Sequence, residues 1–545
     1  MKAKTSFSLA PIRPSVHHLQ LAMAAALLGL QGVPDVEAFA LDTGNPDYAI
    51  AFDNTVKYSA AWRLNNQDDA VRPTYNPNLD DGDNNFNRGL ISDRLDLLSE
   101  LDMSYQRRYG VRVSGAAWYD DVYNRGNDNH TDTVNSLSVR NDQFTTDTRD
   151  FQGRDGELLD AFGYGKFDLG AMSLSLRGGR YSQVYGESLF FGGNGIAVAQ
   201  SPVDINKLLS VPSSTFKEII RPIGQIGGTL LVNQNVTLGA YYQYRWEQAR
   251  LPAAGSYFSY ADFLDEGGES FILGPGVFLR RGKDIDARNS GQFGMQVKIK
   301  SGEFEYGLYA ARYHDKFPQF YLRPGEGDYA LVYGEDIRTF GASVSTLIGE
   351  TNVAAETSIR RNTPLAATGN VVVDFTGTGD GDHNPLYPVG NTFHAQVSAI
   401  SVLANSGLWD GATLLGEVAY NRITSVDKNR DQLDPNVTRN ASSLRMLFTP
   451  EYFQVFPGVD MTVPLGIGYG ISGNTAVLGT GFSPEGGGDM SLGLQFDYRK
   501  TWRGGITVTH YYGSAGGVVD SNGALSGDQV YADRDFVAIS LQRTF

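Results

Sequence analysis

Two short stretches of the chain combine arginine and glutamate in a way that could act on a polar solute. Their members are Arg177, Arg180, Glu187, Arg245, Glu247 and Arg250. Guanidinium groups that face carboxylates across a narrow passage set up a transverse field, which orients polar molecules as they pass. The same groups could instead form salt bridges that anchor one segment to another, because buried charges need partners. The sequence leaves both interpretations open.

Histidine could bring acid–base or nucleophilic chemistry. His314-Asp315 could serve as the dyad of an outer-membrane protease, and His510, near serine, could serve an outer-membrane phospholipase. Neither has a second signal nearby, and Gly186-Glu187-Ser188 lacks the glycine frame of a nucleophile elbow. Gly192-Gly193-Asn194-Gly195 does not lie between a strand and a phosphate-binding helix. The sequence therefore predicts no enzyme activity, no cofactor and no metal site.

The elements that would position these charges are predicted to be β-strands. Residues 536–545 alternate with a period of two and end on an aromatic residue, which is typical of the closing strand of an outer-membrane β-barrel. Leu541 and Phe545, on its apolar face, are the predicted membrane-insertion signal for the barrel assembly machinery. In such a barrel the apolar face of each strand points to lipid rather than to a protein core.

The same alternation recurs along the chain in about eighteen segments of barrel-strand length. Short connections alternate with long ones, as expected for periplasmic turns and external loops. Two turns, at 405–411 and 450–459, are longer than this rule predicts. The predicted fold is all-β: a transmembrane antiparallel barrel of about 16 to 18 strands that occupies residues 41–545.

Composition agrees with export and excludes one class of partner. The net charge of −16 is opposite to the basic face that a nucleic acid would need. Aromatic residues make up 12% of the chain and there is no cysteine, as expected of membrane-surface girdles and an oxidising periplasm. Acidic loops such as 80–85 are predicted to be solvated, or to meet anionic lipopolysaccharide through divalent cations.

The first forty residues read as a secretory signal peptide, with a basic start, a short apolar run over 19–30 and a small-x-small site at Ala38-Phe39-Ala40. The alternative is a retained membrane-anchoring helix. Cleavage would place the protein in the outer membrane of a Gram-negative bacterium, with lipid and lipopolysaccharide as its surroundings.

Residues 186–224 do not resemble the acidic loops. A helix is predicted over 202–209 with Asp204 near its start, and 215–218 could open a second one. The apolar residues here are too many for a solvated loop, and the interior of so wide a barrel needs filling. We therefore predict that this segment, which connects the fifth and sixth strands, folds into the lumen as a constriction or plug; we call it the plug segment. The alternative is a lid over the external mouth. Its marker residues are Phe190, Phe191, Asp204, Leu208 and Phe216.

A second long loop, 256–278, mixes aromatic and acidic residues. It could receive a hydrophobic substrate at a channel mouth, or it could pack against other loops.

The chain resembles a family of proteobacterial outer-membrane proteins catalogued as domain of unknown function 1302. The resemblance covers most of the mature chain and is carried by residues 52–55, Tyr58, Trp62, 88–96, 98–102, 176–180, 185–188, 201–204, 251–258, 280–283 and 286–291. Two departures are Tyr185 in place of a usual Trp, and Tyr181-Ser182 in place of Gln-Val.

The resemblance implies a large barrel whose relatives are encoded near exporters and genes of hydrophobic-compound metabolism. Together these features predict an outer-membrane channel or transporter for small hydrophobic or aromatic molecules. The alternative is a plugged structural or accessory barrel that serves an export-system partner or acts as a surface receptor.

Overall fold

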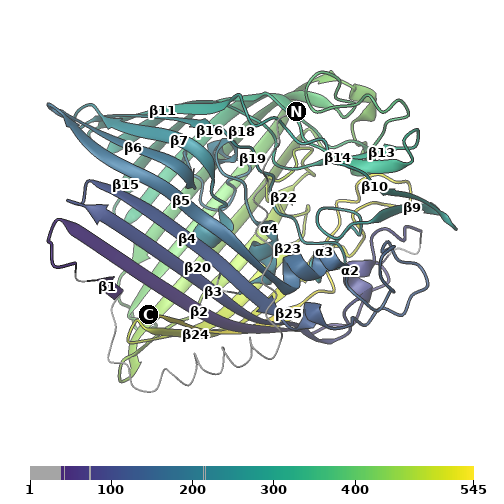
Figure 1. The fold of residues 1–545 in the computed structure, drawn as a ribbon, viewed down its shortest axis with the longest axis horizontal. Coiled ribbons are helices and arrows are strands. Elements are labelled where there is room, and N and C mark those ends of the chain that lie inside the picture. Colours follow the sequence, from purple (N-terminus) through teal and green to yellow (C-terminus); the bar gives the residue numbers. More distant parts are fainter. Residues whose placement is uncertain (1–38, 42, 73–74, 213, 215) are drawn as a thin grey trace, which may run out of the picture.

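The chain forms one closed barrel of 18 antiparallel strands, with the long loops gathered at one end (Figure 1). The structure is a computed structural model that describes residues 39–41, 43–72, 75–212, 214 and 216–545. The wall consists of β2 (Tyr48–Arg63), β3 (Gly89–Tyr105), β4 (Tyr109–Asp120), β5 (Arg154–Leu169), β6 (Met172–Tyr181), β7 (Ile223–Leu231), β8 (Val236–Gln243), β11 (Gln292–Ser301), β12 (Phe304–Tyr313), β15 (Ile337–Ile348), β16 (Thr351–Pro364), β18 (Val389–Leu403), β19 (Gly411–Lys428), β20 (Asn440–Phe456), β21 (Val459–Thr462), β22 (Leu465–Ser472), β23 (Gly488–Tyr498), β24 (Trp502–Tyr512) and β25 (Phe536–Thr544).

The seam of the barrel joins the first and last of these strands. β2 pairs with β25 antiparallel, from Thr55 opposite Thr544 to Arg63 opposite Phe536. β21 and β22 count as one strand, because both pair with β20 and with β23. The predicted strand number and topology are confirmed. The turn expected over 450–459 is shorter than predicted, because β20 continues to Phe456.

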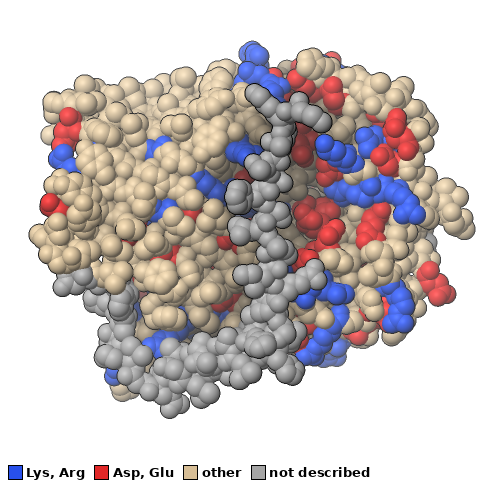
Figure 2. Space-filling model, viewed as in Figure 1, with Lys and Arg blue, Asp and Glu red and all other residues tan. Residues whose placement is uncertain are grey.

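The two faces of the wall differ as a period of two requires. In β16 the inner positions Glu356, Ser358 and Arg360 are buried, whereas Thr357 and Ile359 between them are exposed. Figure 2 shows the consequence on one side of the molecule: few charged side chains over the strands, and many over the loop end. The outer face thus offers a largely uncharged surface to lipid.

The wall is not equally tall all round. β7 and β8 have 9 and 8 residues, about the length that crosses a bilayer. On the other side β19 has 18 residues and β20 has 17, more than a bilayer crossing requires, and β20 extends at the turn end, where Phe456 pairs with Val459.

The long loops are a packed cap rather than solvated chain. A second sheet within them consists of β9 (Ser270–Gly274), β10 (Val277–Arg281), β13 (Gln319–Arg323), β14 (Asp328–Val332) and β17 (Val371–Val373). Loop residues form two apolar cores, one around Phe263 and Phe320 and the other around Phe86 and Tyr257. The loop 256–278 therefore packs on other loops, which was one of its two predicted roles.

The cap also corrects the prediction that loop 80–85 is solvated. All four residues of α2 (Asp81–Asn84) are buried, and Asp83 forms a 2.6 Å ion pair with Arg63. Alternation along a sequence cannot show this, because the burial comes from loops that are distant along the chain.

The helices are short and lie in the connections. They are α2, α3 (Thr146–Thr148), α4 (Ile205–Ser210), α5 (Phe216–Ile219), the 3-10 turns η1 (Val122–Asn124), η3 (Ile196–Ala199), η4 (Thr368–Asn370) and η5 (Arg430–Gln432), and the π-helical turn η2 (Arg149–Gly153). Within the described residues, every helix is too short or too polar to cross a membrane. A short strand, β1 (Phe39–Leu41), pairs with β2. The rest of the predicted signal peptide lies outside the described residues, so its cleavage stays a prediction.

Candidate functional site: a segment held across the lumen

The plug segment lies between β6 and β7, the fifth and sixth strands of the wall, as predicted. Its first part reaches strands β16, β18 and β19, which are separated from β6 along the sheet by β7, β8, β11, β12 and β15. It makes these contacts with side chains on the inner faces of those strands. The segment therefore folds inward and crosses the barrel, rather than lying over the mouth as a lid.

The far end of the segment is held by Glu417 of β19. One carboxylate oxygen, Oε2, accepts hydrogen bonds from the backbone N–H groups of Leu189 (3.2 Å), Phe190 (2.5 Å) and Phe191 (2.9 Å). Glu417 is 1% exposed. A buried carboxylate needs donors, and here three consecutive peptide groups of the segment supply them.

Glu356 of β16 repeats the arrangement next to it. Its Oε2 accepts from the N–H of Glu187 and its Oε1 from the N–H of Ile196, both at 2.7 Å. Gly186 precedes this contact with φ +97°, and a Cβ there would collide with Glu356 Oε2. A side chain at position 186 would therefore conflict both with the backbone conformation and with the carboxylate.

Carbonyl groups of the segment are satisfied by a cation from the same wall. Arg360 Nη2 donates to the carbonyl oxygens of residues 193, 194 and 195 at 2.5 to 3.0 Å. Asn194 Oδ1 lies 2.8 Å from His394 Nδ1, and its Nδ2 donates to Gln396. We call Glu356, Arg360, His394, Gln396 and Glu417 the distal anchor.

The base of the segment is held by ion pairs, which we call the proximal anchor. Arg250 pairs with Asp204 (3.3 Å) and with Glu157 (2.7 Å), and Lys207 also pairs with Glu157 (2.9 Å). Arg180 pairs with Glu247, which in turn pairs with Arg221 of the segment (3.3 Å). These contacts correspond to the anchoring interpretation of the sequence.

The other predicted charges have different neighbours. Glu187 pairs with Lys298 of β11 at 3.1 Å. Arg177 lies over the ring of Phe162, 5.8 Å from its centroid. Arg245 lines a cavity at the loop end.

That cavity is the place where the selectivity interpretation would apply. It has a volume of about 570 Å³ and opens beside the proximal anchor. Arg221, Arg245, Glu247 and Arg250 line it, together with a larger number of carboxylates. A solute here would meet both signs of charge.

The predicted residues of the plug segment occupy distinct places. Asp204 caps α4 by accepting from the N–H of Lys207 at 2.7 Å, so the helix and its cap are confirmed. Phe191 is buried against Phe482, with ring centroids 5.4 Å apart. Phe190 is half-buried, Phe216 begins α5, and the prediction that Leu208 is buried is wrong, because it is 53% exposed.

The segment also builds an aromatic cluster in the lumen. Tyr185 and Ile196 of this connection pack with Tyr241 of β8 and Tyr309 of β12. The rings of Tyr185 and Tyr241 lie 5.5 Å apart. Movement of the segment would therefore uncover aromatic surface on the wall.

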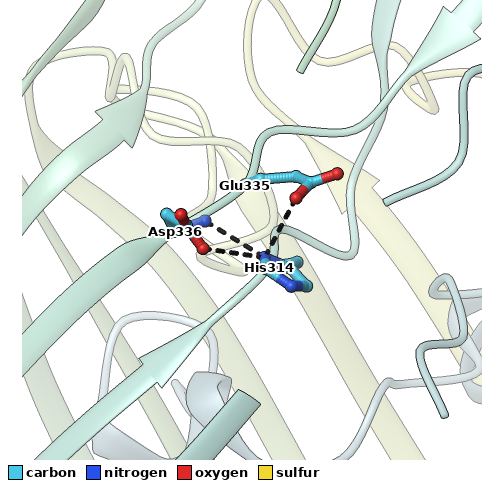
Figure 3. Close-up of side chains that lie close together, drawn as sticks. All are labelled: His314, Glu335 and Asp336. Atoms are coloured by element: carbon cyan, nitrogen blue, oxygen red, sulfur yellow. Dashed lines mark hydrogen bonds and ion pairs between the residues drawn. The ribbon is translucent and has the colours of Figure 1, made fainter. Parts of the chain in front are cut away.

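His314, singled out in the sequence, lies beside Glu335 and Asp336 (Figure 3). Its Nδ1 accepts from the N–H of Asp336 at 3.1 Å, and its Nε2 lies 2.9 Å from the carbonyl oxygen of Ser290. Burial lowers the pKa of this imidazole to about 4, so it is neutral at pH 7.

Arg288 ties the two carboxylates of this group together. It pairs with both Glu335 and Asp336, and Arg312 pairs with Asp336 at 2.5 Å. Both ring nitrogens of His314 are engaged and both carboxylates face guanidinium groups, so the arrangement is a structural ion-pair network rather than a metal centre. Asp315 accepts from the N–H groups of residues 316 and 317, which is not the geometry of a His–Asp dyad.

His510 has an acidic partner on the outer face. Its Nδ1 lies 2.6 Å from Asp535 Oδ2, and it stands opposite Met490 across the ladder. Among the described residues, no hydroxyl group hydrogen-bonds to it, and a nucleophile would require one.

The residues of the distal anchor were not predicted from the sequence. Glu356 and Glu417 could be placed on inner faces by alternation, but nothing in their spacing shows that they meet the backbone of residues 187–196. The interaction uses peptide N–H groups, which every sequence carries.

The strand order and the segment held inside the lumen define a β-barrel of the outer-membrane type with an inward-folded segment. The chain belongs to the family described as protein of unknown function (DUF1302), which matches residues 19–545.

Several solved outer-membrane proteins are similar in outline. They include OccAB1 of Acinetobacter baumannii (12% identity, 93% of this chain and 98% of the other, TM-score 0.43) and OccD3 (OpdP) of Pseudomonas aeruginosa (10%, 93% and 93%, 0.40). OpdK of Pseudomonas aeruginosa, solved with vanillate, is similar at 9% identity (91% and 98%, 0.39). The comparison with curated proteins finds no match. At these TM-scores the likeness is only general, and the fold assignment rests on the closed strand order.

Proposed function

We propose that this protein is an outer-membrane channel in a Gram-negative bacterium and that the plug segment is its gate. The observation that carries the proposal is the way the segment is attached. It crosses the lumen and is held against the wall by hydrogen bonds, an ion pair and side-chain packing. Among the described residues none of these contacts is a β-ladder, so the segment can leave the wall without any change in the strands.

The size of the barrel supports a passage. A wall of 18 strands encloses more space than its own side chains fill. The segment occupies part of that space and brings its own peptide groups to the buried glutamates. A barrel that needed only a filled interior could bury apolar side chains there and avoid the desolvation of two carboxylates.

We further propose that the substrates are small hydrophobic or aromatic molecules. The support is the cluster of Tyr185, Ile196, Tyr241 and Tyr309 between the segment and the wall. Aromatic side chains suit flat apolar ligands, and tyrosine adds a hydroxyl group that can orient them. The charged cavity at the loop end would act earlier, by selecting the polar end of an incoming molecule.

Planar-bilayer recording tests the gate. Deletion of residues 187–222 should raise the conductance relative to the intact protein. Transport should then be measured in liposomes with an aromatic acid and a sugar of similar size. The substrate proposal predicts faster entry of the aromatic acid, and equal rates would contradict it.

The second candidate is a permanently plugged barrel that serves an export-system partner or a surface receptor. The packed cap favours it, because the loop cores lie above the same end of the barrel. Electrical silence of both the intact and the deleted protein would support this candidate and end the channel proposal.

A further inference from the structure

Three carboxylates meet inside the cap, away from the plug segment. Asp80 and Asp81 come from the loop after β2, and Asp262 comes from the loop after β8. One oxygen of each lies within 4.8 Å of the others. Asp81 is 8% and Asp262 is 2% exposed.

No lysine, arginine or histidine of the described residues forms an ion pair with these three groups. Arg72 and Arg534 act on them only at longer range, and both form ion pairs with Asp83 instead. Two buried carboxylates and a half-buried one thus share a site without a cation, which is costly unless the charge is compensated.

A second observation concerns oxygen atoms that lack partners. Asp262 Oδ2 accepts from the N–H groups of Asp80 and Asp81 (2.8 and 3.2 Å), but its Oδ1 has no hydrogen-bond partner among the described residues. The same holds for Asp80 Oδ1. Buried oxygens without donors are rare and call for an unseen partner.

A side-chain amide oxygen beside the cluster also lacks a hydrogen-bond partner. Asn135 is 1% exposed, and its backbone N–H donates to Asp81 Oδ2 at 3.3 Å. Its side-chain amide donates to Asn78 and to the carbonyl of Ser270, both at 2.8 Å, which fixes its orientation. Its Oδ1 has no partner within the described part of the chain.

We propose that Asp80, Asp81 and Asp262 form a calcium site that joins two loops of the cap, with Asn135 of a third loop beside it. Ca²⁺ takes carboxylate and amide oxygens at about 2.3 to 2.6 Å, so two of its ligands lie within about 5 Å of each other. The three carboxylate oxygens lie within 4.8 Å of one another, which meets that requirement. Mg²⁺ fits less well, because it keeps several waters in a strict octahedron.

The place of the site in the cap gives it a structural role. Asp262 lies one residue before Phe263 of one apolar core, and α2 precedes Phe86 of the other. Asn135 belongs to the loop after β4. An ion here would hold these loops together at the external end, independently of whether the lumen conducts.

Protons compete with a cation for these groups. Burial raises the pKa of Asp80, Asp81 and Asp262 above the usual range of a carboxyl group. Deprotonation is required for binding, so the affinity for calcium should fall as the pH is lowered.

The test uses the full-length protein in detergent, stripped with EDTA and titrated with CaCl₂ by calorimetry. We expect a saturable site whose affinity drops by at least about tenfold in Asp262→Asn and in Asp80→Asn. Asp132→Asn, an exposed carboxylate in the loop after β4, is the matched control and should leave the affinity unchanged.

Limited proteolysis gives a second readout. Calcium should slow cleavage of the cap in the wild type and in the control but not in Asp262→Asn. Equal calcium titrations of the wild type and both cluster variants would overturn the proposal. If Asp262→Asn fails to shift on unheated gels, and so has not folded, Asp80→Asn decides alone.

Discussion

The two ends of the plug segment are attached by different chemistry. The proximal anchor consists of side-chain ion pairs between residues such as Arg250 and Asp204, with Arg250 partly exposed to the cavity. The distal anchor consists of buried side chains of the wall that bind backbone N–H and carbonyl groups of the segment. The first can exchange partners with water and salt, whereas the second leaves unpaired groups whenever it opens.

This difference suggests how the segment moves. Opening at the distal end exposes peptide groups and glutamates to a lumen that must already contain water or substrate. The proximal pairs open only in part while this happens, so the segment would swing about its base. Four measurements test this difference between the two anchors.

The largest effect is expected from Glu417→Ala, which leaves three N–H groups of the segment without their acceptor. Loss of these charge-assisted bonds should favour the open state by about 3 kcal/mol, a shift of about 100-fold. Single-channel recording should show a higher open fraction. Asp489→Ala is the control, since it removes a charge that pairs with Arg445 and not with the segment.

A smaller effect is expected from Arg250→Ala. The change removes two ion pairs, but Lys207 stays on Glu157 and Asp204 still caps α4. We expect about 1 to 2 kcal/mol toward the open state, because Arg250 keeps some contact with water and both of its carboxylates retain another hydrogen-bond donor. An open fraction above that of Glu417→Ala would show that the base, not the tip, holds the gate.

Arg180→Ala should have less effect still. Arg180 and Glu247 are each about a quarter exposed, and Arg221 remains paired with Glu247. A change of about 1 kcal/mol or less is expected. Thermal melting of the detergent-solubilised variant should stay within a few degrees of the wild type, and a large drop would contradict the assignment.

A change in ionic strength should give the smallest effect on the open fraction, and it should distinguish the proximal from the distal anchor. Raising the ionic strength from about 0.1 to 1 M shortens the screening length from about 10 to 3 Å. The open fraction of Glu417→Ala relative to wild type should change little, because the distal contacts are buried. The ratio of the open fraction of Arg250→Ala to that of the wild type should move toward one. An unchanged ratio would mean that the ion pairs of Arg250 are not screened by salt.

The parts of this molecule that could be predicted from sequence are those whose signals are local. Strand number follows from a period of two, and the cap of α4 follows from Asp204 before an apolar turn. The inward position of the plug segment follows from its apolar residues, although Leu208 shows that each one need not be buried.

The remainder depends on partners that are distant along the chain. Glu417 meets Phe191, and Asp81 meets Asp262, only because the barrel and the cap bring them together. The burial of α2 runs against composition, since Asp and Asn at a loop tip usually indicate solvent. Such contacts carry no spacing signal, and the distal anchor uses peptide groups that have no sequence signal at all.

The seam between β2 and β25 has a consequence for assembly. Every other neighbouring pair in the wall is close in sequence, whereas Trp62 and Val537 belong to opposite ends of the described chain. Until that last ladder forms, the sheet has two free edges that could pair with another copy. The insertion route must therefore shield both edges at once. Any variant that slows the pairing of β2 with β25 should aggregate through these edges before it misfolds.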